Sequence, residues 1–312
     1  MSMFNLLKDT IREWREDGAN RLAAALAYYT TFSLAPLLVL IIAIAGLAGG
    51  REAAQTQTMA QVEDLLGTDG RDFVQGMIES ASKPATGLTA TLLGAVTLLF
   101  GALGVFGELQ NSLNTIWEVK PKPARGMLDG IKRFILKRLL SFTMVLGIGF
   151  LLLASLIVSA ALSAFSEYIG TRWAFADFWL ELISFIISFM VITLLFGMIF
   201  KFLPEIKIAW KDVWLGAAVT SILFSLGKFL IGLYLGRSEV GNTFGAAGSL
   251  AILLIWIYYS AQILFFGAEF TQVYANRYGS RIVPDPDMVK LSEVERAEKG
   301  IPHEKKMGKA SR

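Results

Sequence analysis

The sequence predicts an all-α, polytopic membrane protein with six transmembrane helices and both termini in the cytoplasm. The chain has 312 residues, 54% of them apolar, and a mean hydropathy of +0.54, which excludes a typical soluble domain. Six long runs contain no charged side chain, and five of them reach the roughly 20 residues that a helix needs to cross a bilayer. The predicted spans cover residues 22–50, 85–117, 139–166, 178–200, 211–236 and 243–275.

The orientation is predicted from the positions of lysine and arginine. With a cytoplasmic amino terminus, 23 of the 29 Lys and Arg residues fall in cytoplasmic segments. Short cytoplasmic loops of membrane proteins carry this excess of positive charge. We therefore expect a cytoplasmic amphipathic segment at 1–21, a six-helix membrane domain at 22–279 and a charged cytoplasmic tail at 280–312. The net charge of +3 then describes topology and gives no indication of nucleic-acid binding.

The N-terminal segment is predicted to form an amphipathic helix. Its apolar residues recur at helical spacing, with basic residues on the other side; the apolar set is Phe4, Leu7, Ile11 and Trp14. This pattern is typical of a helix that lies in the cytoplasmic membrane interface. A soluble cap packed on the loops would give the same pattern. The apolar run that follows is too long for a cleavable signal, so it is expected to stay as the first span.

The first span contains Pro36 near its middle, which predicts a kink because proline cannot complete the helical hydrogen bond. The external loop that follows is acidic and carries two short apolar stripes on either side of residues 67–70. We expect two short amphipathic helices there, joined by a turn at these residues. They could cover a cavity or lie freely at the interface.

The cytoplasmic loops and the tail carry weaker signals. Residues 118–138 are interpreted as an interfacial lead-in to the third span. The tail is expected to be mobile, with Asp285 able to cap one short helix before Pro286. Glycine pairs four residues apart are interpreted as sites of close helix packing; these are Gly46 and Gly50, Gly232 and Gly236, and Gly241 and Gly245, together with the series Gly101, Gly104 and Gly107.

Two glutamates inside predicted spans are the main candidates for function. Glu108 lies nine residues before Trp117, and Glu269 lies eight residues before Arg277, so both are about 12–13 Å inside the membrane at 1.5 Å per residue. Ionisable groups at this depth are costly and usually face a bundle interior or a wet cavity. The sequence therefore predicts that each glutamate has polar side chains as neighbours.

Polar residues share a helix face with each glutamate. In the second span Glu108 is accompanied by Asn111 and Asn114, and the opposite face with Leu109, Leu113 and Ile116 is predicted to contact lipid. In the sixth span Glu269 shares a face with Tyr259 and Gln262. These stripes indicate either a polar cavity that binds a cation, a proton or a headgroup, or a hydrogen-bond network that only fastens the two helices.

Lys228 is the one basic residue within an apolar run. It lies nine residues before Arg237, in the outer half of the fifth span. Helical side chains lean toward their own amino terminus, which here is the cytoplasmic direction, so snorkelling to the outer surface works against this lean. A paired or substrate-facing lysine and a snorkelling lysine both remain open.

Enzyme chemistry has little support. The chain has no cysteine, and its one histidine, His303, lies in the tail, so no thiolate, metal centre or His-carboxylate dyad is predicted. No catalytic residue and no cofactor are expected. No nucleotide-binding motif is present, so active transport would have to use an ion gradient or a partner protein.

Several motifs resemble the YihY/BrkB membrane proteins. They are Ala27–Pro36 (AYYTTFSLAP), Gly107–Trp117 (GELQNSLNTIW), Phe244–Gly248 (FGAAG), Trp256–Ser260 (WIYYS) and Gly267–Glu269 (GAE). The resemblance covers roughly residues 10–280. It implies a six-helix, multi-pass protein of the bacterial inner membrane and adds no catalytic residues to those considered above. The family's old ribonuclease label is regarded as a misassignment. Phe244 stands where relatives often have tyrosine.

The sequence therefore supports a transporter, exporter or lipid-handling permease with a polar intramembrane cavity as the leading hypothesis. Its partners would be the lipid bilayer and a small solute, ion or lipid. The alternative is a structural or envelope-assembly protein that acts through protein partners. A nuclease is the least supported of the three.

Overall fold

The computed structural model describes residues 3–82, 101, 104–123, 176–235, 246–280, 282–286 and 288–291, together with scattered positions between 127 and 150. Its helices are α1 (Met3–Glu16), α2 (Ala19–Gly49), α3 (Arg51–Ala81), α6 (Ala176–Phe202), α7 (Trp210–Leu235) and α9 (Ala246–Arg277). Residues 104–116 are also helical and are referred to as the 104–116 helix. Four short strands complete the described part: β1 (Val119–Pro121), β2 (Ile206–Lys207), β3 (Val283–Pro284) and β4 (Met288–Lys290).

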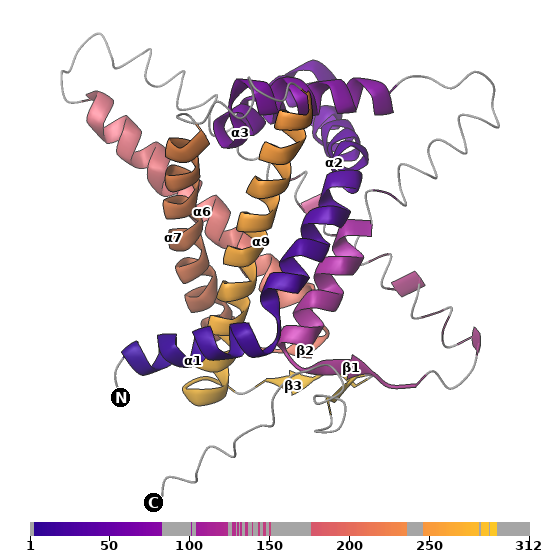
Figure 1. The fold of residues 1–312 in the computed structure, drawn as a ribbon, viewed down its shortest axis with the longest axis vertical. Coiled ribbons are helices and arrows are strands. Elements are labelled where there is room, and N and C mark those ends of the chain that lie inside the picture. Colours follow the sequence, from indigo (N-terminus) through magenta and orange to yellow (C-terminus); the bar gives the residue numbers. More distant parts are fainter. Residues whose placement is uncertain are drawn as a thin grey trace, which may run out of the picture.

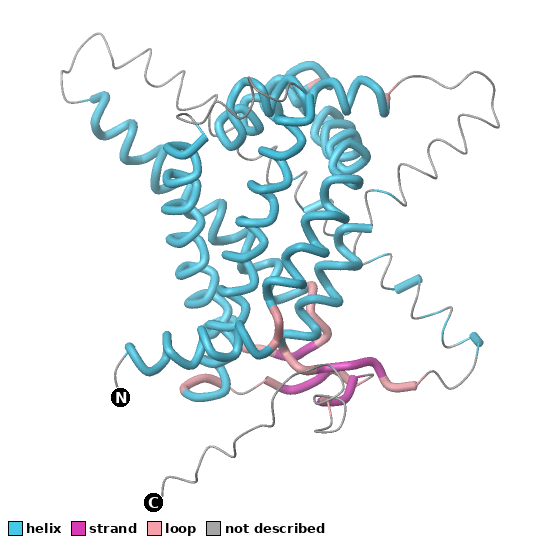
Figure 2. Tube along the Cα trace, viewed as in Figure 1, coloured by secondary structure: helices cyan, strands magenta, loops and turns pink. Residues whose placement is uncertain are grey.

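Long helices run between two ends that are covered by shorter elements. Figure 1 shows α1 lying across the lower end, near the strands, and α3 lying across the upper end. The strands and α1 lie at the same end in Figure 2. Helix α9 is central, because it packs against α1, α2, α3 and α7, while α6 packs on α7. The bundle is therefore built around α9.

Four of the described helices are long and apolar enough to cross a membrane. The qualifying stretches are Ala19–Leu47, Phe185–Phe202, Trp210–Ile231 and Gly248–Arg277. They correspond to the first, fourth, fifth and sixth spans expected from the sequence. The expected span at 85–117 is described only from residue 101 onward, and most of the expected span at 139–166 lies outside the described residues.

Pro36 lies inside α2, which continues through it as one helix. The 104–116 helix approaches α2 closely at this level. A Cβ atom added at Gly101 would lie 3.2 Å from Cγ of Pro36, and one at Gly104 would lie 3.4 Å from Oγ of Ser33. The predicted close-packing role of these two glycines therefore agrees with the structure. Gly232 is described only in its backbone, and Gly236, Gly241 and Gly245 lie outside the described residues.

The glycines at the end of α2 lie where the chain turns into α3. Gly50 has φ +86° and joins α2 directly to α3, and a Cβ at Gly46 would lie 3.0 Å from Cα of Arg51. These glycines therefore permit a tight corner within one chain segment, since only glycine readily adopts such a φ. The close helix approach predicted for this pair is found at Gly46, against the first residue of α3, and Gly50 forms the corner between the two helices.

Helix α3 is broken at Gly67, where φ is +75°, within the turn expected at residues 67–70. Its two halves bury apolar side chains against the ends of α2 and α9. This cluster includes Met59, Leu66, Val74 and Ile78 of α3, Ile42 of α2, and Leu253 and Ile257 of α9. Burial of these side chains holds α3 across the end of the bundle.

Close contact between α7 and α9 depends on small residues that face threonine or tyrosine. A Cβ atom at Gly216 would lie 1.8 Å from Oγ1 of Thr271, and one at Gly267 would lie 1.9 Å from Oγ1 of Thr220. The two threonines bond back to their own helices, because each hydroxyl donates to a carbonyl four residues earlier. Close approach of this kind is how helices pack in membranes, where apolar side chains gain little from leaving lipid.

Two sequence-based predictions about the end of the bundle near the strands were wrong. The face of the 104–116 helix with Leu109, Leu113 and Ile116 is buried in the main core, whereas it was predicted to contact lipid. Apolar side chains form both the core and the lipid-facing surface of a membrane protein, so polarity alone does not separate the two.

The second correction concerns the start of the tail. Residues 282–291 were predicted to be mobile, with a short helix after Asp285, but they form β3 and β4. These strands pair antiparallel with β2 and β1, and the Asp285 N–H donates to the Glu205 carbonyl at 3.2 Å. The partner strands come from loops far away in the sequence, which local patterns do not reveal.

Candidate intramembrane polar site

Glu269 of α9 is the most deeply buried of the predicted site residues. Its exposed fraction is 0%. Neither carboxyl oxygen accepts a hydrogen bond from a donor among the described residues. A buried carboxylate without a donor is costly, because it loses its hydration and gains no compensating hydrogen bond. Within the described residues, no donor therefore stabilises the ionised form of Glu269.

The neighbours of Glu269 come from α1 and from the turn that follows it. The Asp17 carboxyl lies within hydrogen-bonding range of the Glu269 carboxyl, and the Glu13 carboxyl is close enough to act on it electrostatically. Asp17 itself is only 2% exposed. Gly18, with φ +65°, turns the chain from α1 into α2 and keeps Asp17 in this position. Two buried carboxyls from distant segments thus meet at the inner end of α9.

Sequence reasoning missed Asp17 and Glu13. The signal was present, because Leu6, Thr10, Glu13 and Asp17 repeat at i, i+4, i+7 and i+11 and share one side of a helix. Leu6 and Thr10 are buried against the bundle, and Leu6 packs with Phe270 and Val273 of α9. Of the apolar stripe noted in the sequence, Phe4 is 71% exposed and Ile11 is 43% exposed, whereas Trp14 packs against the main core.

Ion pairs hold α1 on α9. Arg277, the last residue of α9, pairs with Asp9 of α1, and both side chains are mostly buried. Within α1, Arg12 donates to Glu13 at 2.8 Å, and this hydrogen bond raises the pKa of the Arg12 guanidinium. Helix α1 therefore has an acidic inner side that faces α9 and an apolar outer side.

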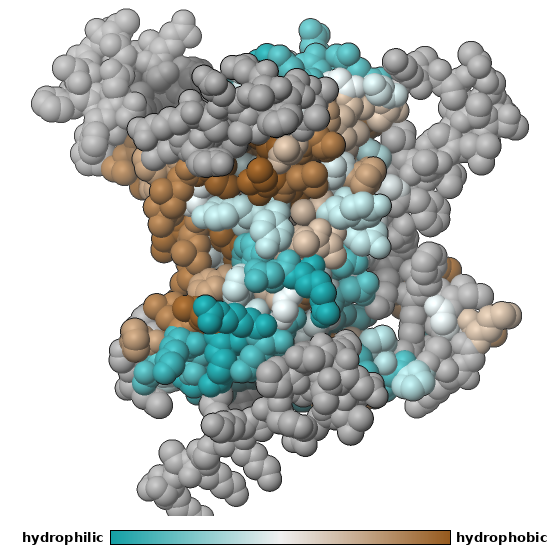
Figure 3. All heavy atoms as spheres, in the orientation of Figure 1, coloured by the Kyte–Doolittle hydropathy of each residue, from teal (hydrophilic) through white to brown (hydrophobic). Residues whose placement is uncertain are grey.

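Tyr259 and Gln262 line a cavity of about 350 Å³ between α1, α7 and α9. The remaining lining residues are Ile11, Trp14, Arg15, Leu223, Leu226, Ile263 and Phe266. Gln262 Nε2 donates to Oδ1 of Asn20 at the start of α2, at 2.8 Å. In Figure 3, hydrophilic colouring rises from the lower end of this face toward its middle. The cavity is thus polar near α1 and apolar along α7.

The polar residues of the 104–116 helix are separated from one another. Glu108 is partly buried and Asn111 is exposed. Asn114 is buried and bonds twice to Glu205: its Nδ2 donates to the carboxylate at 2.9 Å, and its Oδ1 accepts from the backbone N–H at 3.0 Å. Asn114 therefore holds the loop before β2, and neither it nor Glu108 lines either of the two cavities found in the described part of the chain.

A hydrogen bond fixes the register of the 104–116 helix and α9. Gln272 donates to the carbonyl of Ile116 at 2.7 Å. Both helices run toward the end with the strands, so Glu269, three residues before Gln272, lies nearer that end than Glu108, eight residues before Ile116. The offset of five residues corresponds to about 7.5 Å along the helix axis. The matched depth of the two glutamates in the membrane stays a prediction.

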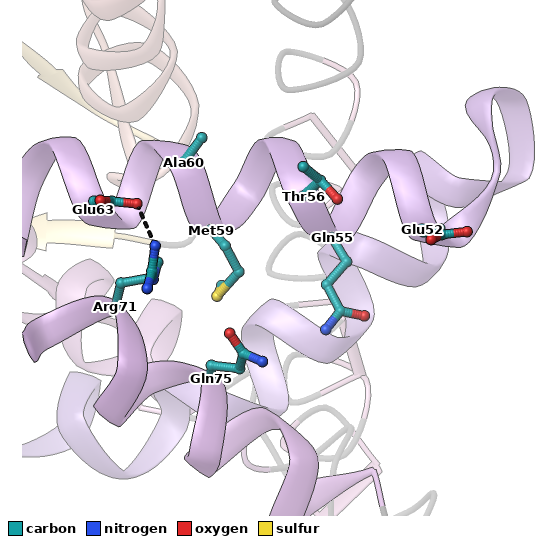
Figure 4. A pocket seen from close by; sticks show the side chains of 8 residues that line it. All are labelled: Glu52, Gln55, Thr56, Met59, Ala60, Glu63, Arg71 and Gln75. Atoms are coloured by element: carbon teal, nitrogen blue, oxygen red, sulfur yellow. Dashed lines mark hydrogen bonds and ion pairs between the residues drawn. The ribbon is translucent and has the colours of Figure 1, made fainter. Parts of the chain in front are cut away.

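Lys228 forms an ion pair with Asp64 of α3 at the other end of the bundle. Lys228 is thus paired, with a carboxylate of the segment that the sequence analysis expects outside the membrane. A second cavity, of about 440 Å³, lies between the two halves of α3, and Figure 4 shows Gln75 facing Met59 across it, with Arg71 pointing toward Glu63. Arg71 also donates to Glu63 at 2.8 Å, which ties the two halves together.

Among the described residues, the predicted polar site is thus distributed over separate places. Tyr259 and Gln262 share one cavity, Glu269 lies beside Asp17, Asn114 bonds to Glu205, and Lys228 pairs with Asp64. Within that same part of the chain, no group of three His, Asp or Glu side chains is placed to hold a metal ion. Helix α1 contributes to the cavity with Tyr259 and Gln262 and leads into Asp17, which lies beside Glu269.

Comparisons with known proteins agree on the family. The family model described as Virulence factor BrkB matches residues 10–291. The UPF0761 membrane protein of Alcanivorax borkumensis is 25% identical over 260 residues, which cover 83% of this chain and 58% of the relative. The UPF0761 membrane protein of Stenotrophomonas maltophilia is 30% identical over 259 residues, covering 81% of this chain and 57% of the relative.

A third relative, the UPF0761 membrane protein of Albidiferax ferrireducens, is 30% identical over 266 residues, covering 83% of this chain and 60% of the relative. The chain thus spans 57–60% of the length of these three relatives. No solved structure matches it. The family match covers nearly the whole chain, and the relatives are membrane proteins, as the apolar helices of the structure require. The chain therefore belongs to the BrkB virulence-factor family of membrane proteins.

Proposed function

We propose that this protein is a six-span permease of the bacterial inner membrane with both termini in the cytoplasm. In this proposal residues 22–279 form the membrane domain, 1–21 lie in the cytoplasmic interface and 280–312 are a cytoplasmic tail. The outward-facing apolar residues of α1 support the interfacial position, because lipid is their most favourable surrounding. The two halves of α3 cover the external end, in line with the two external helices expected from the sequence.

We further propose that Glu269 carries a proton that is coupled to transport. The observation that carries this proposal is the burial of the Glu269 carboxyl, without a donor, beside the Asp17 carboxyl. Two adjacent carboxyls in a low-dielectric place repel each other when both are ionised, and one shared proton removes the repulsion. A proton needs one acceptor oxygen, whereas a bound metal ion needs several ligands. Intramembrane carboxyls of this kind mark proton relays in pumps and transporters.

Helix α1 is the element that would control access to this proton. It covers Glu269 through Glu13 and Asp17, and it is held by the Arg277–Asp9 pair and by Leu6. Outward movement of α1 would hydrate Glu269 from the cytoplasm, and its return would seal the carboxyl again. A coupled permease needs two such states with different proton access.

The experiment measures charge movement after a pH jump, using purified protein in proteoliposomes on a solid-supported membrane. The protein should give a transient current without any cargo, and Glu269→Gln should abolish it. Glu108→Gln is the matched control in another span and should keep the current. An equal transient in the Glu269→Gln protein would overturn the proposal.

One observation favours a second candidate, a structural or envelope-assembly protein. Lys228 is bound to an external carboxylate and Asn114 to a cytoplasmic loop, so these polar residues fasten the ends of the bundle. In that case deletion of residues 52–82 should abolish the cellular phenotype of the protein while Glu269→Gln retains it. The permease proposal requires that Glu269→Gln lose the phenotype. An enzymatic role is not proposed.

A further inference from the structure

The cavity between α1, α7 and α9 combines an apolar wall with a polar end. Leu223 and Leu226 of α7 and Ile263 and Phe266 of α9 form the wall, and Leu226 is itself 54% exposed on the bundle surface. This surface is the side of a helix that crosses the membrane, so lipid lies beside it. The volume of about 350 Å³ is within the roughly 300–1,000 Å³ of typical ligand pockets.

Two lining residues have buried polar atoms without a partner among the described residues. They are the indole Nε1 of Trp14, which can only donate, and the amide Oε1 of Gln262, which can only accept. Unsatisfied buried atoms are rare in folded proteins, and a bound ligand is one of the ways in which they are satisfied. Both residues lie at the α1 end of the cavity.

Arg15 supplies positive charge at the same end. It is exposed and lines the cavity, and in the described part of the chain the ion pairs within α1 are made by Arg12 and not by Arg15. Guanidinium groups bind phosphate oxygens by charge-assisted hydrogen bonds. An anionic headgroup therefore fits the polar end.

We infer that this cavity binds an anionic phospholipid of the cytoplasmic leaflet, with the phosphate at Arg15 and an acyl chain along Leu223, Leu226 and Phe266. A lipid is favoured over a free phosphate because most of the lining is apolar and opens toward the hydrocarbon. The outward-facing apolar residues of α1 place Arg15 at headgroup level, where anionic lipids concentrate. The inference goes beyond the proposed transport activity, and it rests on the proposed cytoplasmic position of α1.

The experiment uses the full-length protein with p-benzoylphenylalanine in place of Leu226, in vesicles of phosphatidylethanolamine with a minor fraction of phosphatidylglycerol. Irradiation should attach phosphatidylglycerol well above its share of the bilayer. Arg15→Gln should reduce this enrichment about tenfold, since a hydrogen bond to a charged group contributes that much binding. Lys8→Gln, an exposed charge on the same helix, is the matched control and should change it less than about threefold.

Leu223→Trp provides a second test that leaves Arg15 in place. Its larger ring should fill the apolar wall and lower the labelling, and size-exclusion chromatography verifies that each variant is folded. Labelling in proportion to bilayer composition, or equal enrichment in the parent and Arg15→Gln proteins, would overturn the inference. Loss of the phosphatidylglycerol label on adding glycerol phosphate would also overturn it, because the site would then bind a soluble anion.

The same vesicles separate this inference from the proposed function. Glu269→Gln should keep the phosphatidylglycerol label while it loses the pH-jump current. If Glu269→Gln keeps both the label and the current, the lipid site is supported and the proton-coupled permease is refuted. If the current depends on Glu269 but the parent protein shows no lipid enrichment, the permease is supported and the lipid site is refuted.

Discussion

The Arg277–Asp9 pair should control the exposure of the surface between α1 and α9. Its side chains are 17% and 14% exposed, so the pair is mostly withdrawn from solvent. Breaking a fully buried pair costs about 3–5 kcal/mol, and the remaining exposure reduces this to about 2 kcal/mol for Asp9→Asn. A cost of about 2 kcal/mol multiplies the population with α1 displaced about 30-fold, because about 1.4 kcal/mol corresponds to a factor of ten.

The assay uses a single reporter cysteine, since the chain has no cysteine of its own. Thr10 is 0% exposed between α1 and the bundle, so Thr10→Cys should react slowly with a membrane-impermeant maleimide. Adding Asp9→Asn should raise the labelling rate about 30-fold. Lys8→Gln is the control, because Lys8 is an exposed charge of the same helix and does not pair with Asp9 among the described residues. Equal labelling rates with and without Asp9→Asn would refute the role of the pair in holding α1.

Three further predictions concern other contacts. Gly267→Ala should destabilise the protein by about 1–3 kcal/mol through overpacking against Thr220, which is measured as a lower melting temperature in detergent. Adding Thr220→Gly should restore part of the lost stability. Lys228→Met should change thermal stability by less than about 1 kcal/mol, because its partner Asp64 is 67% exposed; a larger loss would show a tighter contact. Asn114→Ala should cost about 1–3 kcal/mol in denaturant unfolding, since it removes two buried hydrogen bonds, and an unchanged midpoint would contradict this.

The sequence predicted those parts of the fold that depend on local composition. The long apolar runs of α2, α6, α7 and α9 identified membrane helices, because length and hydropathy decide this property. The break in α3 was predicted at Gly67 from turn-forming residues. The fastening of Lys228 to Asp64 and of the tail strands to distant loops was not predictable, because these contacts join segments far apart in the chain.

In the candidate site, too, local composition predicted some features, whereas contacts between distant segments were missed. Glu269 was singled out from its position in an apolar run, and its burial agrees with that reasoning. Asp17 was passed over because it lies in a charged segment, where an acidic residue usually faces water. Only the packing of α1 on α9 shows that this acidic side faces inward, beside Glu269.

The most direct test of the account is the protonation of Glu269 itself. Infrared spectroscopy of the purified protein at neutral pH should show the carbonyl stretch of a protonated carboxyl group, and this band should disappear in Glu269→Gln but persist in Glu108→Gln. Absence of the band, or its persistence in Glu269→Gln, would contradict the claim that Glu269 holds a proton beside Asp17.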